Sequence, residues 1–380
     1  MKLRSLVFGV LSMLALSVAF TACSDNDDES SNDDGSVVEL PKKRAFILNE
    51  GKYQGNNAGI AFYAPDQNAK DSKYNFITDI YKLQNQKGLG DSAYDIIEHD
   101  NYIYVVVYGS KLLLKLNEAG VEQQRLSFSE ADGQPRYLEA KDGKIYVSLY
   151  SGKVARVDAK TMLIEAYADA NANPEQMVIE NNKLYVVNSG WGSGNTMTEI
   201  DLTTFKKIQD VTIVVNPSYL LEANDELYAI SYGAWGDPVT SYSFQRIYKT
   251  MEGDKEVMKY EVIKDVKASI FAEHNDIIYL INSETNWDDH TAVNTLCTYN
   301  AKTHTLNKTS FLKDMPEALK KSIIYSISID EDGGDFYLAT SNYASGSTIN
   351  GDVYRFSSNG TFIGKFDCGG ISPRKILFIN

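Results

Sequence analysis

The chain has 380 residues, a formal net charge of −14 and three cysteines, with 25 tyrosines and 15 phenylalanines against eight prolines. An acidic chain without a concentrated basic patch is a poor partner for nucleic acid and for anionic lipid surfaces. The many aromatic residues favour β-strands, and this length admits either two or three ordinary domains or one closed array of repeats.

Residues 1–22 have the pattern of a secretory signal peptide. Lys2 and Arg4 give a basic start, residues 6–20 form an apolar run, and small residues precede Cys23. The apolar run is short for a membrane-spanning helix and suits a signal sequence. The ending Phe-Thr-Ala-Cys resembles a bacterial lipobox, which implies that Cys23 is lipidated. An ordinary signal peptide followed by an incidental cysteine is the alternative.

Residues 23–43 are predicted to be a flexible tether. The run SDNDDESSNDDGS directly after Cys23 is acidic and has no apolar residue, so it has nothing to bury in a core. It also resembles the surface-export signal of Bacteroidetes lipoproteins. We therefore expect the folded part of the chain to begin at residue 44.

A repeated unit organises residues 44–380. In residues 135–158, the sequence PRYLEAKDGKIYVSLYSGKVARVD predicts three short strands, at 137–140, 145–149 and 154–157, separated by tight turns at 142–143 and 151–152. Related units begin near residues 93, 174, 217, 268 and 325. Their second strands centre on aromatic residues spaced 39 to 58 positions apart, namely Phe46, Tyr104, Tyr146, Tyr185, Tyr228, Tyr279 and Tyr337. Such spacing is typical of propeller blades.

The seventh unit is divided between the two ends of this region. Residues 45–48 and 59–63 supply its second and third strands, and residues 373–379 supply the missing first strand. A divided repeat allows the last strand to pair with the first blade, which removes the free sheet edges of a ring. We therefore predict an all-β fold, a seven-bladed β-propeller covering residues 44–380. An irregular β-sandwich is the alternative, but it gives no reason to divide one repeat.

Two connections depart from the regular repeat. Residues 71–90 form a long polar connection, and residues 304–323 form the largest insertion. Within the insertion, Asp314 and Pro316 precede a segment that ends in Lys320 and Lys321, which predicts the one short helix of the fold. Cys297 and Cys368 fall in strands of different blades, so buried free thiols are expected rather than a disulfide.

Propeller topology places the starts of the first strands and the loops between second and third strands on the same face. The loops carry amides and large aromatics, including all three tryptophans. The first-strand starts add residues around the channel mouth, which are Tyr94, Asp95, Arg136, Tyr137, Glu175, Gln176, Tyr219, Tyr325 and Arg374. Exposed aromatics together with amides suit a bulky, largely neutral ligand. Packing of each aromatic against its own blade is the alternative.

Signals for catalysis are few. The four histidines are scattered, and no Ser/His/Asp set, Cys/His dyad or Gly-rich phosphate loop occurs in the sequence. Asp95 and Glu175 could meet near the channel and hold a metal, as in lactonase-type propellers, but Arg136 and Arg374 in equivalent positions could neutralise them instead. Asp288 and Asp289 could bind calcium, although solvated acids are the simpler interpretation. We expect no enzyme activity, no cofactor and no resident metal.

Several stretches carry a family resemblance that covers residues 45–380. The sequences ILNEGKYQGNNAGIAFYAPD, GLGDSAYDI and NPEQMVIENNKLYVVNSG, with the ending GDVYRFSSNGTFIGKF and PRKILF, resemble the YncE-like surface lipoproteins of Bacteroidetes. Within that group the chain is similar to the BtuG-like cobalamin-binding propellers that partner an outer-membrane TonB-dependent transporter. The resemblance implies capture of a corrinoid outside the cell, as a bound ligand, and its transfer to the transporter.

The sequence therefore predicts an outer-membrane lipoprotein that is held by its lipid anchor, faces the cell exterior and binds cobalamin or a related corrinoid. A glycan- or protein-binding propeller without catalytic activity is the alternative function, because tryptophans also stack on sugar rings. The residues expected to contact the ligand are Asn49, Asn57, Tyr108, Arg136, Tyr150, Glu175, Trp191, Tyr232, Trp235, Trp287, Tyr343 and Arg374.

Overall fold

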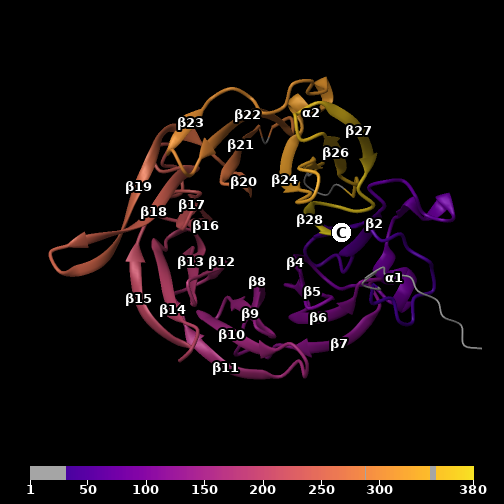
Figure 1. The fold of residues 1–380 in the computed structure, drawn as a ribbon, viewed down its shortest axis with the longest axis horizontal. Helices are drawn as coiled ribbons and strands as arrows, with labels where there is room; N and C mark the ends of the chain where they lie inside the picture. Colours follow the sequence, from indigo (N-terminus) through magenta and orange to yellow (C-terminus); the bar gives the residue numbers. More distant parts are fainter. Residues whose placement is uncertain (1–30, 287, 343–347) are drawn as a thin grey trace, which may run out of the picture. The chain divides into compact units, whose positions relative to one another are not determined.

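This computed structural model describes residues 31–286, 288–342 and 348–380. In these residues the chain forms seven four-stranded antiparallel sheets. Figure 1 shows them arranged around a common axis as the blades of a propeller. The innermost strands of neighbouring blades contact one another all the way round the ring. The predicted seven-bladed β-propeller is confirmed, and the sandwich alternative is excluded. Cys23, Trp287, Tyr343 and the predicted signal peptide lie outside the described residues.

Each blade runs from an innermost strand beside the central channel to an outermost strand at the rim. In that order, blade 1 consists of β28 (Pro373–Ile379), β1 (Arg44–Asn49), β2 (Gly59–Tyr63) and β3 (Phe76–Ile77). Blade 2 consists of β4 (Ala93–His99), β5 (Tyr102–Val107), β6 (Leu112–Asn117) and β7 (Glu122–Ser127). Blade 3 consists of β8 (Pro135–Lys141), β9 (Lys144–Leu149), β10 (Lys153–Asp158) and β11 (Ile164–Asp169). Blade 4 consists of β12 (Pro174–Glu180), β13 (Lys183–Asn188), β14 (Thr196–Asp201) and β15 (Lys206–Thr212). Blade 5 consists of β16 (Pro217–Ala223), β17 (Glu226–Ser231), β18 (Ser243–Glu252) and β19 (Lys255–Lys267). Blade 6 consists of β20 (Ile270–His274), β21 (Ile277–Asn286), β22 (Thr291–Asn300) and β23 (Thr305–Asn307). Blade 7 consists of β24 (Ile323–Ile329), β25 (Phe336–Ser341), β26 (Asp352–Phe356) and β27 (Phe362–Asp367).

Blade 1 closes the ring by joining segments from opposite ends of the sequence. Strand β28 pairs antiparallel with β1, with Phe46 opposite Leu377 and Ala45 opposite Phe378. The division of this blade is as predicted. Ile376 of β28 is 4 % exposed and packs with Tyr337 and Val353 of blade 7, so the closing strand also contributes to the core between blades.

The repeated aromatic residue of the second strand packs into the core. Tyr104, Tyr185, Tyr228 and Tyr337 are at most 1 % exposed. The Tyr104 hydroxyl donates to the carbonyl of Ala159 in the next blade, so this tyrosine joins two blades by packing and by a hydrogen bond. An aromatic ring with a polar tip suits such a position, because the ring fills the space between sheets while the hydroxyl reaches a backbone acceptor.

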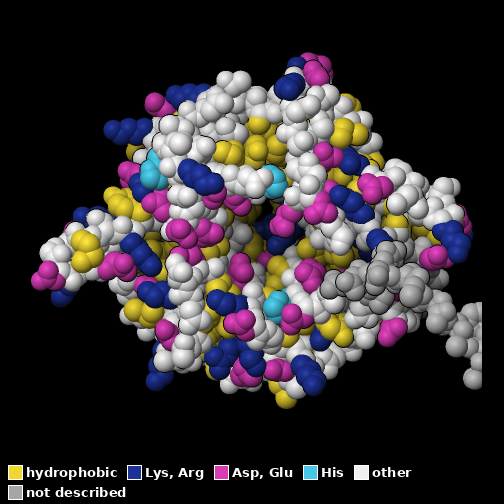
Figure 2. Space-filling view, viewed as in Figure 1, with side chains coloured by type: hydrophobic (Ala, Val, Ile, Leu, Met, Phe, Trp, Pro, Cys, Tyr) yellow, Lys and Arg dark blue, Asp and Glu magenta, His cyan; other side chains and the backbone are white. Residues whose placement is uncertain are grey.

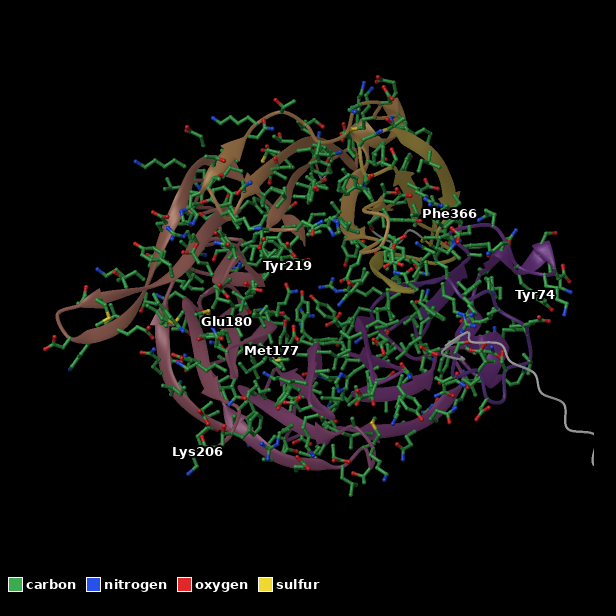
Figure 3. All side chains as sticks on the ribbon, viewed as in Figure 1. Tyr74, Met177, Glu180, Lys206, Tyr219 and Phe366 are labelled. Carbon is green, nitrogen blue, oxygen red and sulfur yellow. The ribbon has the colours of Figure 1, made fainter. Side chains whose placement is uncertain are left out.

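The prediction of three strands per repeat was incomplete, because every blade has a fourth, outermost strand. Strand β7, with the sequence EQQRLS, has no fully buried residue, and β19 is exposed along most of its length. An outer strand that buries so few apolar side chains lacks the pattern that identifies a strand in a sequence. In Figure 3, Lys206 of the outer strand β15 lies at the rim of the ring, whereas Tyr219 of β16 lies toward its centre.

The described residues contain two α-helices where one was predicted. The expected helix is α2 (Glu317–Lys321). The sequence predicted Asp314 as its cap, which is wrong, because Pro316 is the cap residue and no side chain caps the helix. The second is α1 (Ile80–Asn85), inside the connection interpreted as polar. Asp79 caps α1 by accepting a hydrogen bond from the Lys82 amide, and Ile80 and Tyr81 are buried. Short 3-10 turns lie at Ser72–Asn75 and Gly190–Gly192.

Residues 31–43, which the sequence assigns to the tether, lie against blades 1 and 2 from Ser31 onward. Asp33 makes an ion pair with Arg44, whose side chain is 1 % exposed, and the amide of Asn32 donates to Glu118. These contacts attach part of the acidic run to the propeller. Asp33 is needed there because a buried guanidinium requires a compensating anion.

Two further findings concern cysteines and membrane helices. Cys297 and Cys368 are buried and unpaired, as predicted. Burial raises the pKa of the Cys368 thiol to about 12, so it stays protonated at neutral pH. Across the ranges that the structure describes, no helix combines the length and apolar character needed to cross a membrane.

The two faces of the propeller differ in character. In Figure 2, acidic side chains gather around the central hollow on the face that carries the turns after the innermost strands. Those turns contribute Glu98, Asp100, Glu180, Glu222, Asp225, Glu273 and Asp276. The opposite face, formed by the loops between second and third strands, carries the exposed tryptophans and the pocket described next.

Candidate functional site

A pocket of about 960 Å³ opens on the face that carries the loops between second and third strands. This volume is at the upper end of the usual range for small-molecule sites. The pocket receives residues from the loops of blades 4 and 5 and from the starts of the innermost strands. Its aromatic and charged lining residues are Tyr94, Arg136, Tyr137, Glu175, Trp191, Tyr219, Tyr232, Trp235, Asp237, Tyr242, Tyr325 and Arg374.

The ring of Tyr94 lies at the floor of the pocket between two arginines. The guanidinium carbons of Arg136 and Arg374 are 3.4 and 3.3 Å from the ring centroid. Two cations cannot share one ring face at that distance, so each arginine covers one face. Burial raises the pKa of Tyr94 well above its ordinary value, although both arginines act to lower it, so the ring remains a neutral phenol.

Arg136 is held by Glu175 of the next blade. Its Nε and Nη2 atoms lie 3.0 and 2.9 Å from Glu175 Oε2. The other oxygen, Oε1, accepts from the Tyr150 hydroxyl at 2.6 Å and from Ser189 Oγ at 3.0 Å. Burial acts to lower the pKa of Arg136, but Tyr94 and Glu175 outweigh it and raise the pKa. Both oxygens of the Glu175 carboxylate therefore accept hydrogen bonds from protein groups.

Arg374 has an equivalent arrangement on the other side of Tyr94. Its Nη1 donates to Glu50 Oε2 at 3.2 Å and to the Tyr325 hydroxyl at 3.1 Å, and its Nη2 donates to the Tyr137 hydroxyl at 3.2 Å. The Tyr325 hydroxyl in turn donates to Glu50. The floor thus contains two compensated arginine–glutamate pairs, and its arginines add no uncompensated charge.

Two exposed tryptophans border the pocket. Trp191 is 69 % exposed and Trp235 is 86 % exposed, although both are large apolar side chains. The backbone of Trp191 is left-handed, with a φ of 56°, which costs a bulky residue about 1–2 kcal/mol. Tyr150 contacts Trp191 edge-to-face, with centroids 5.8 Å apart. Strain and exposure at the same residue are the combination expected of a side chain kept for contact with another molecule.

The structure brings together half of the predicted ligand-binding residues. Arg136, Glu175, Trp191, Tyr232, Trp235 and Arg374 all line the pocket. Tyr108 and Tyr150 lie beside it, since the guanidinium of Arg136 is 5.2 and 4.7 Å from their ring centroids.

Asn49 and Asn57 are placed elsewhere. Asn49 is 1 % exposed, and its side chain bonds to Cys368, so it supports the closure of blade 1. Asn57 accepts from the amide of Lys52 within its own loop. Trp287 and Tyr343 lie outside the described residues.

Sequence reasoning missed Ser189 and Gly192. Ser189 donates to Glu175, and Gly192 allows Trp235 to lie close to the backbone of blade 4. The close approach at Gly192 could have been predicted, because Gly192 directly follows a tryptophan in a glycine-rich loop, where close backbone approach is common.

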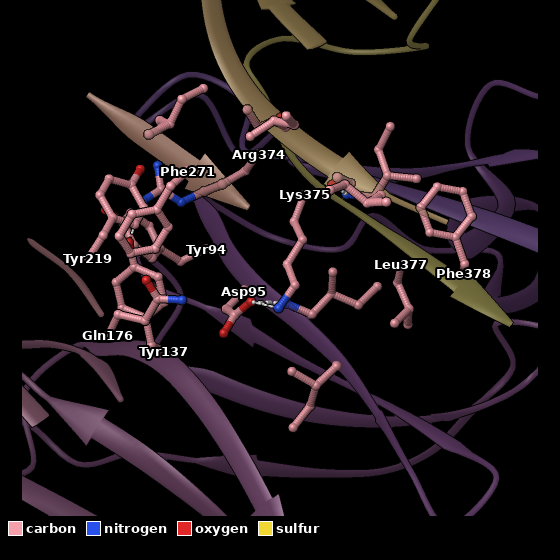
Figure 4. Close-up of a pocket in the computed structure, with 18 of the residues that line it drawn as sticks. Tyr94, Asp95, Tyr137, Gln176, Tyr219, Phe271, Arg374, Lys375, Leu377 and Phe378 are labelled. Atoms are coloured by element: carbon pink, nitrogen blue, oxygen red, sulfur yellow. Dashed lines mark hydrogen bonds and ion pairs between the residues drawn. The ribbon is translucent and has the colours of Figure 1, made fainter. Parts of the chain in front are cut away.

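A second, smaller chamber of about 480 Å³ lies below the floor, toward the acidic face. Six residues line both spaces and separate them, namely Tyr94, Tyr137, Tyr219, Ile270, Tyr325 and Arg374. In this chamber Lys375 Nζ donates to Asp95 Oδ1 at 2.9 Å (Figure 4). Burial raises the pKa of nearby Glu139 to about 8, with Lys375 opposing and Asp95 adding to the shift.

The idea that Asp95 and Glu175 meet to hold a metal is not supported by their contacts. Asp95 accepts from Lys375 and from the amides of Ile96 and Leu138, whereas Glu175 pairs with Arg136. Neutralisation, the alternative left open by the sequence, is the arrangement found, with a lysine in place of an arginine beside Asp95. Among the described residues, no group of three or more His, Cys, Asp or Glu side chains is placed to hold a metal ion.

Fold and site together define the chain as a seven-bladed β-propeller with an aromatic pocket on one face. No family model matches the chain, and no curated protein matches it. Many solved structures share its fold. A hypothetical selenium-binding protein from Sulfolobus tokodaii has a TM-score of 0.61 at 12% identity, with 90% of this chain and 94% of that chain covered.

Two further solved structures extend the comparison. A functionally unknown protein from Desulfotomaculum acetoxidans has a TM-score of 0.59 at 10% identity, covering 90% of this chain and 99% of that one. Virginiamycin B lyase from Staphylococcus aureus has a TM-score of 0.51 at 13% identity, covering 72% and 83%. At these identities, the likeness concerns the fold alone.

Proposed function

We propose that this propeller is a non-enzymatic binding protein that captures a bulky, largely uncharged ligand in the aromatic pocket. The observation that carries the proposal is the pocket itself, which combines a volume of about 960 Å³, a charge-compensated floor and two exposed tryptophans at its border. Aromatic side chains supply apolar contact area, while tyrosine hydroxyls and guanidinium groups orient a polar ligand by hydrogen bonds.

A corrinoid such as cobalamin is the specific ligand we propose. It is large and carries carboxamides around its rim, so it offers both apolar surface and hydrogen-bonding groups to this pocket. The support is the chemical match with the pocket and the resemblance of the sequence to cobalamin-binding propellers.

The test is a calorimetric titration of residues 31–380, which form one compact unit, with cyanocobalamin. We expect one-to-one binding that Trp235→Ala weakens about ten-fold or more, the loss expected when a central aromatic contact is removed. Because the Trp235 side chain is 86 % exposed, this variant should melt close to the wild type. Tyr167→Ala, which removes a half-exposed aromatic from the outer strand β11, is the matched control and should bind normally. Absence of heat and of any thermal shift at ligand excess would exclude cobalamin.

Glycan binding is the second candidate, and the two bordering tryptophans favour it, because exposed indoles stack on sugar rings. Retention on polysaccharide affinity gels, lost in Trp191→Ala and Trp235→Ala, would support this function.

The cellular role we propose is delivery of the captured ligand to an outer-membrane TonB-dependent transporter by a surface lipoprotein anchored through Cys23. Loss of palmitate labelling in Cys23→Ser, with release of the protein from the membrane fraction, would support the anchor. Co-purification with a TonB-dependent transporter from intact cells, absent for an unrelated surface lipoprotein, would support the partner.

A further inference from the structure

The two arginines at the floor do not make the pocket an anion site. Arg136 shares its charge with Glu175 through two nitrogens, and Arg374 pairs with Glu50. An anionic group placed beside Arg136 would feel the attraction of the guanidinium together with the repulsion of Glu175, which lies 2.9 Å from Nη2, so its net attraction is weaker than that of an unpaired arginine. A carboxylate or sulfonate would lose its hydration on entry without a compensating cation.

Arg136 nevertheless keeps one donor for a ligand. Nε and Nη2 are engaged with Glu175, and Nη2 also contacts the Tyr94 hydroxyl. Among the described residues, none accepts a hydrogen bond from Nη1, and the side chain lines the pocket at 13 % exposure. Stacking on Tyr94 and the fork to Glu175 fix the direction of this donor. A neutral acceptor, such as a carboxamide carbonyl, is the group it suits.

Glu175 cannot leave its place to admit an anion. Its side chain is 6 % exposed and accepts from Arg136, Tyr150 and Ser189, so rotation would break all of these contacts and strand a buried charge. The compensation of Arg136 is therefore a fixed property of the pocket.

We propose that Glu175 sets the charge selectivity of the pocket by compensating Arg136, so that the pocket takes neutral, carbonyl-bearing ligands and rejects anionic analogues of the same shape. This deepens the proposed function and rests on the same pocket being a ligand site. Glu175 is a positioning residue, because it acts through Arg136 without contacting the ligand. Removal of its charge converts the pocket into an anion site.

The test uses two dyes with one aromatic skeleton, neutral N-phenyl-1-naphthylamine and anionic 8-anilinonaphthalene-1-sulfonate. Binding is read as energy transfer from tryptophan to dye, counting only the signal that Trp235→Ala removes. We expect the wild type to prefer the neutral dye. In Glu175→Gln we expect affinity for the anionic dye to rise about ten-fold, and affinity for the neutral dye to change less than about two-fold. Glu256→Gln, the same charge change on the exposed strand β19, is the control and should change neither.

A second variant covers the case in which Glu175→Gln does not fold. Arg136→Gln leaves Glu175 uncompensated and should weaken the anionic dye further while the neutral dye still binds. An unchanged dye ratio in both variants, a wild-type preference for the anionic dye, or no signal sensitive to Trp235 would each overturn the inference. Because neither dye is a corrinoid, failure of cyanocobalamin to bind would contradict the proposed ligand without deciding the dye result.

Discussion

Gly192 lies directly against Trp235 of the neighbouring blade. A Cβ atom placed on Gly192 would come within 2.4 Å of Trp235 Nε1, closer than any real contact permits. Because the backbone of blade 4 approaches the indole this closely, the positions of Trp191 and Trp235 are coupled across the boundary between blades 4 and 5. The pocket border is therefore one unit built by two blades.

Gly192→Ala should displace Trp235 and weaken ligand binding about ten-fold or more while lowering stability only slightly, by about 1 kcal/mol for a positive φ. The measurement is a titration with cyanocobalamin, the ligand proposed above, alongside tryptophan emission and the melting temperature. Gly143→Ala, in the turn between β8 and β9 and away from the pocket, is the matched control, because Gly143 has a φ of 69° but nothing lies within 4 Å of its added Cβ. Equal binding losses in the two variants would show that backbone strain, and not the contact with Trp235, is responsible.

Asp33→Asn should destabilise the propeller by about 1–3 kcal/mol. The change leaves the guanidinium of Arg44, 1 % exposed, without the carboxylate that now lies 2.6 and 2.7 Å from its two terminal nitrogens. Guanidinium chloride unfolding of residues 31–380 measures the effect. Asp34→Asn removes an adjacent, exposed acid and should leave stability unchanged. If both variants unfold like the wild type, residues 31–43 do not stabilise the ring.

Ile376→Ala in the closing strand should cost about 2–4 kcal/mol, since it opens a cavity between blades 1 and 7 at a side chain that is 4 % exposed. Ile363→Ala on the outer strand β27, where the side chain is 52 % exposed, is the control and should change stability by less than about 0.5 kcal/mol. Thermal and denaturant unfolding give the two values. A negligible loss at Ile376 would contradict a packed closure.

The stability of the protein should fall as pH rises toward 8, in part because of Glu139. Its pKa is about 8 in the fold, against about 4.3 in an unfolded chain, so the folded state holds a proton that the unfolded state has lost. The contribution is complete below about pH 4 and is lost as pH rises through 8.

Glu139→Gln should remove the part of this dependence that comes from Glu139, so that the melting temperatures of variant and wild type diverge between pH 5 and pH 9 in favour of the variant. Glu98→Gln, at the exposed mouth of the same chamber, is the control. Parallel curves for Glu139→Gln and the wild type would contradict the raised pKa.

The ring could be predicted from the sequence because its core carries the signal. Tyr185 and Tyr228 follow tight turns at fixed spacing, and buried second strands such as β13 are nearly continuous apolar runs. The outer strands could not be predicted in the same way, because β7 and β19 bury little and obtain their strand geometry by pairing with the strand inside them.

The site could be predicted in part. Topology alone placed Arg136, Glu175 and Arg374 at one mouth of the channel, but which charge pairs with which depends on side-chain directions across blades. Asn49 shows the same limit, because its partner Cys368 is 319 positions away in the sequence. An asparagine at the end of a strand can turn inward or face solvent, and the sequence alone does not distinguish the two until the closing strand is in place.

Strand β28 carries Arg374 as well as Ile376, so the segment that completes the ring also completes the pocket floor. A chain in which residues 373–379 have not yet docked lacks both the cation beneath Tyr94 and the last wall between the two chambers. The pocket floor is therefore complete only when the ring is closed, so ligand binding requires the docked closing strand. Ligand binding would then report on ring closure, because a propeller with an undocked β28 lacks Arg374 at the pocket floor.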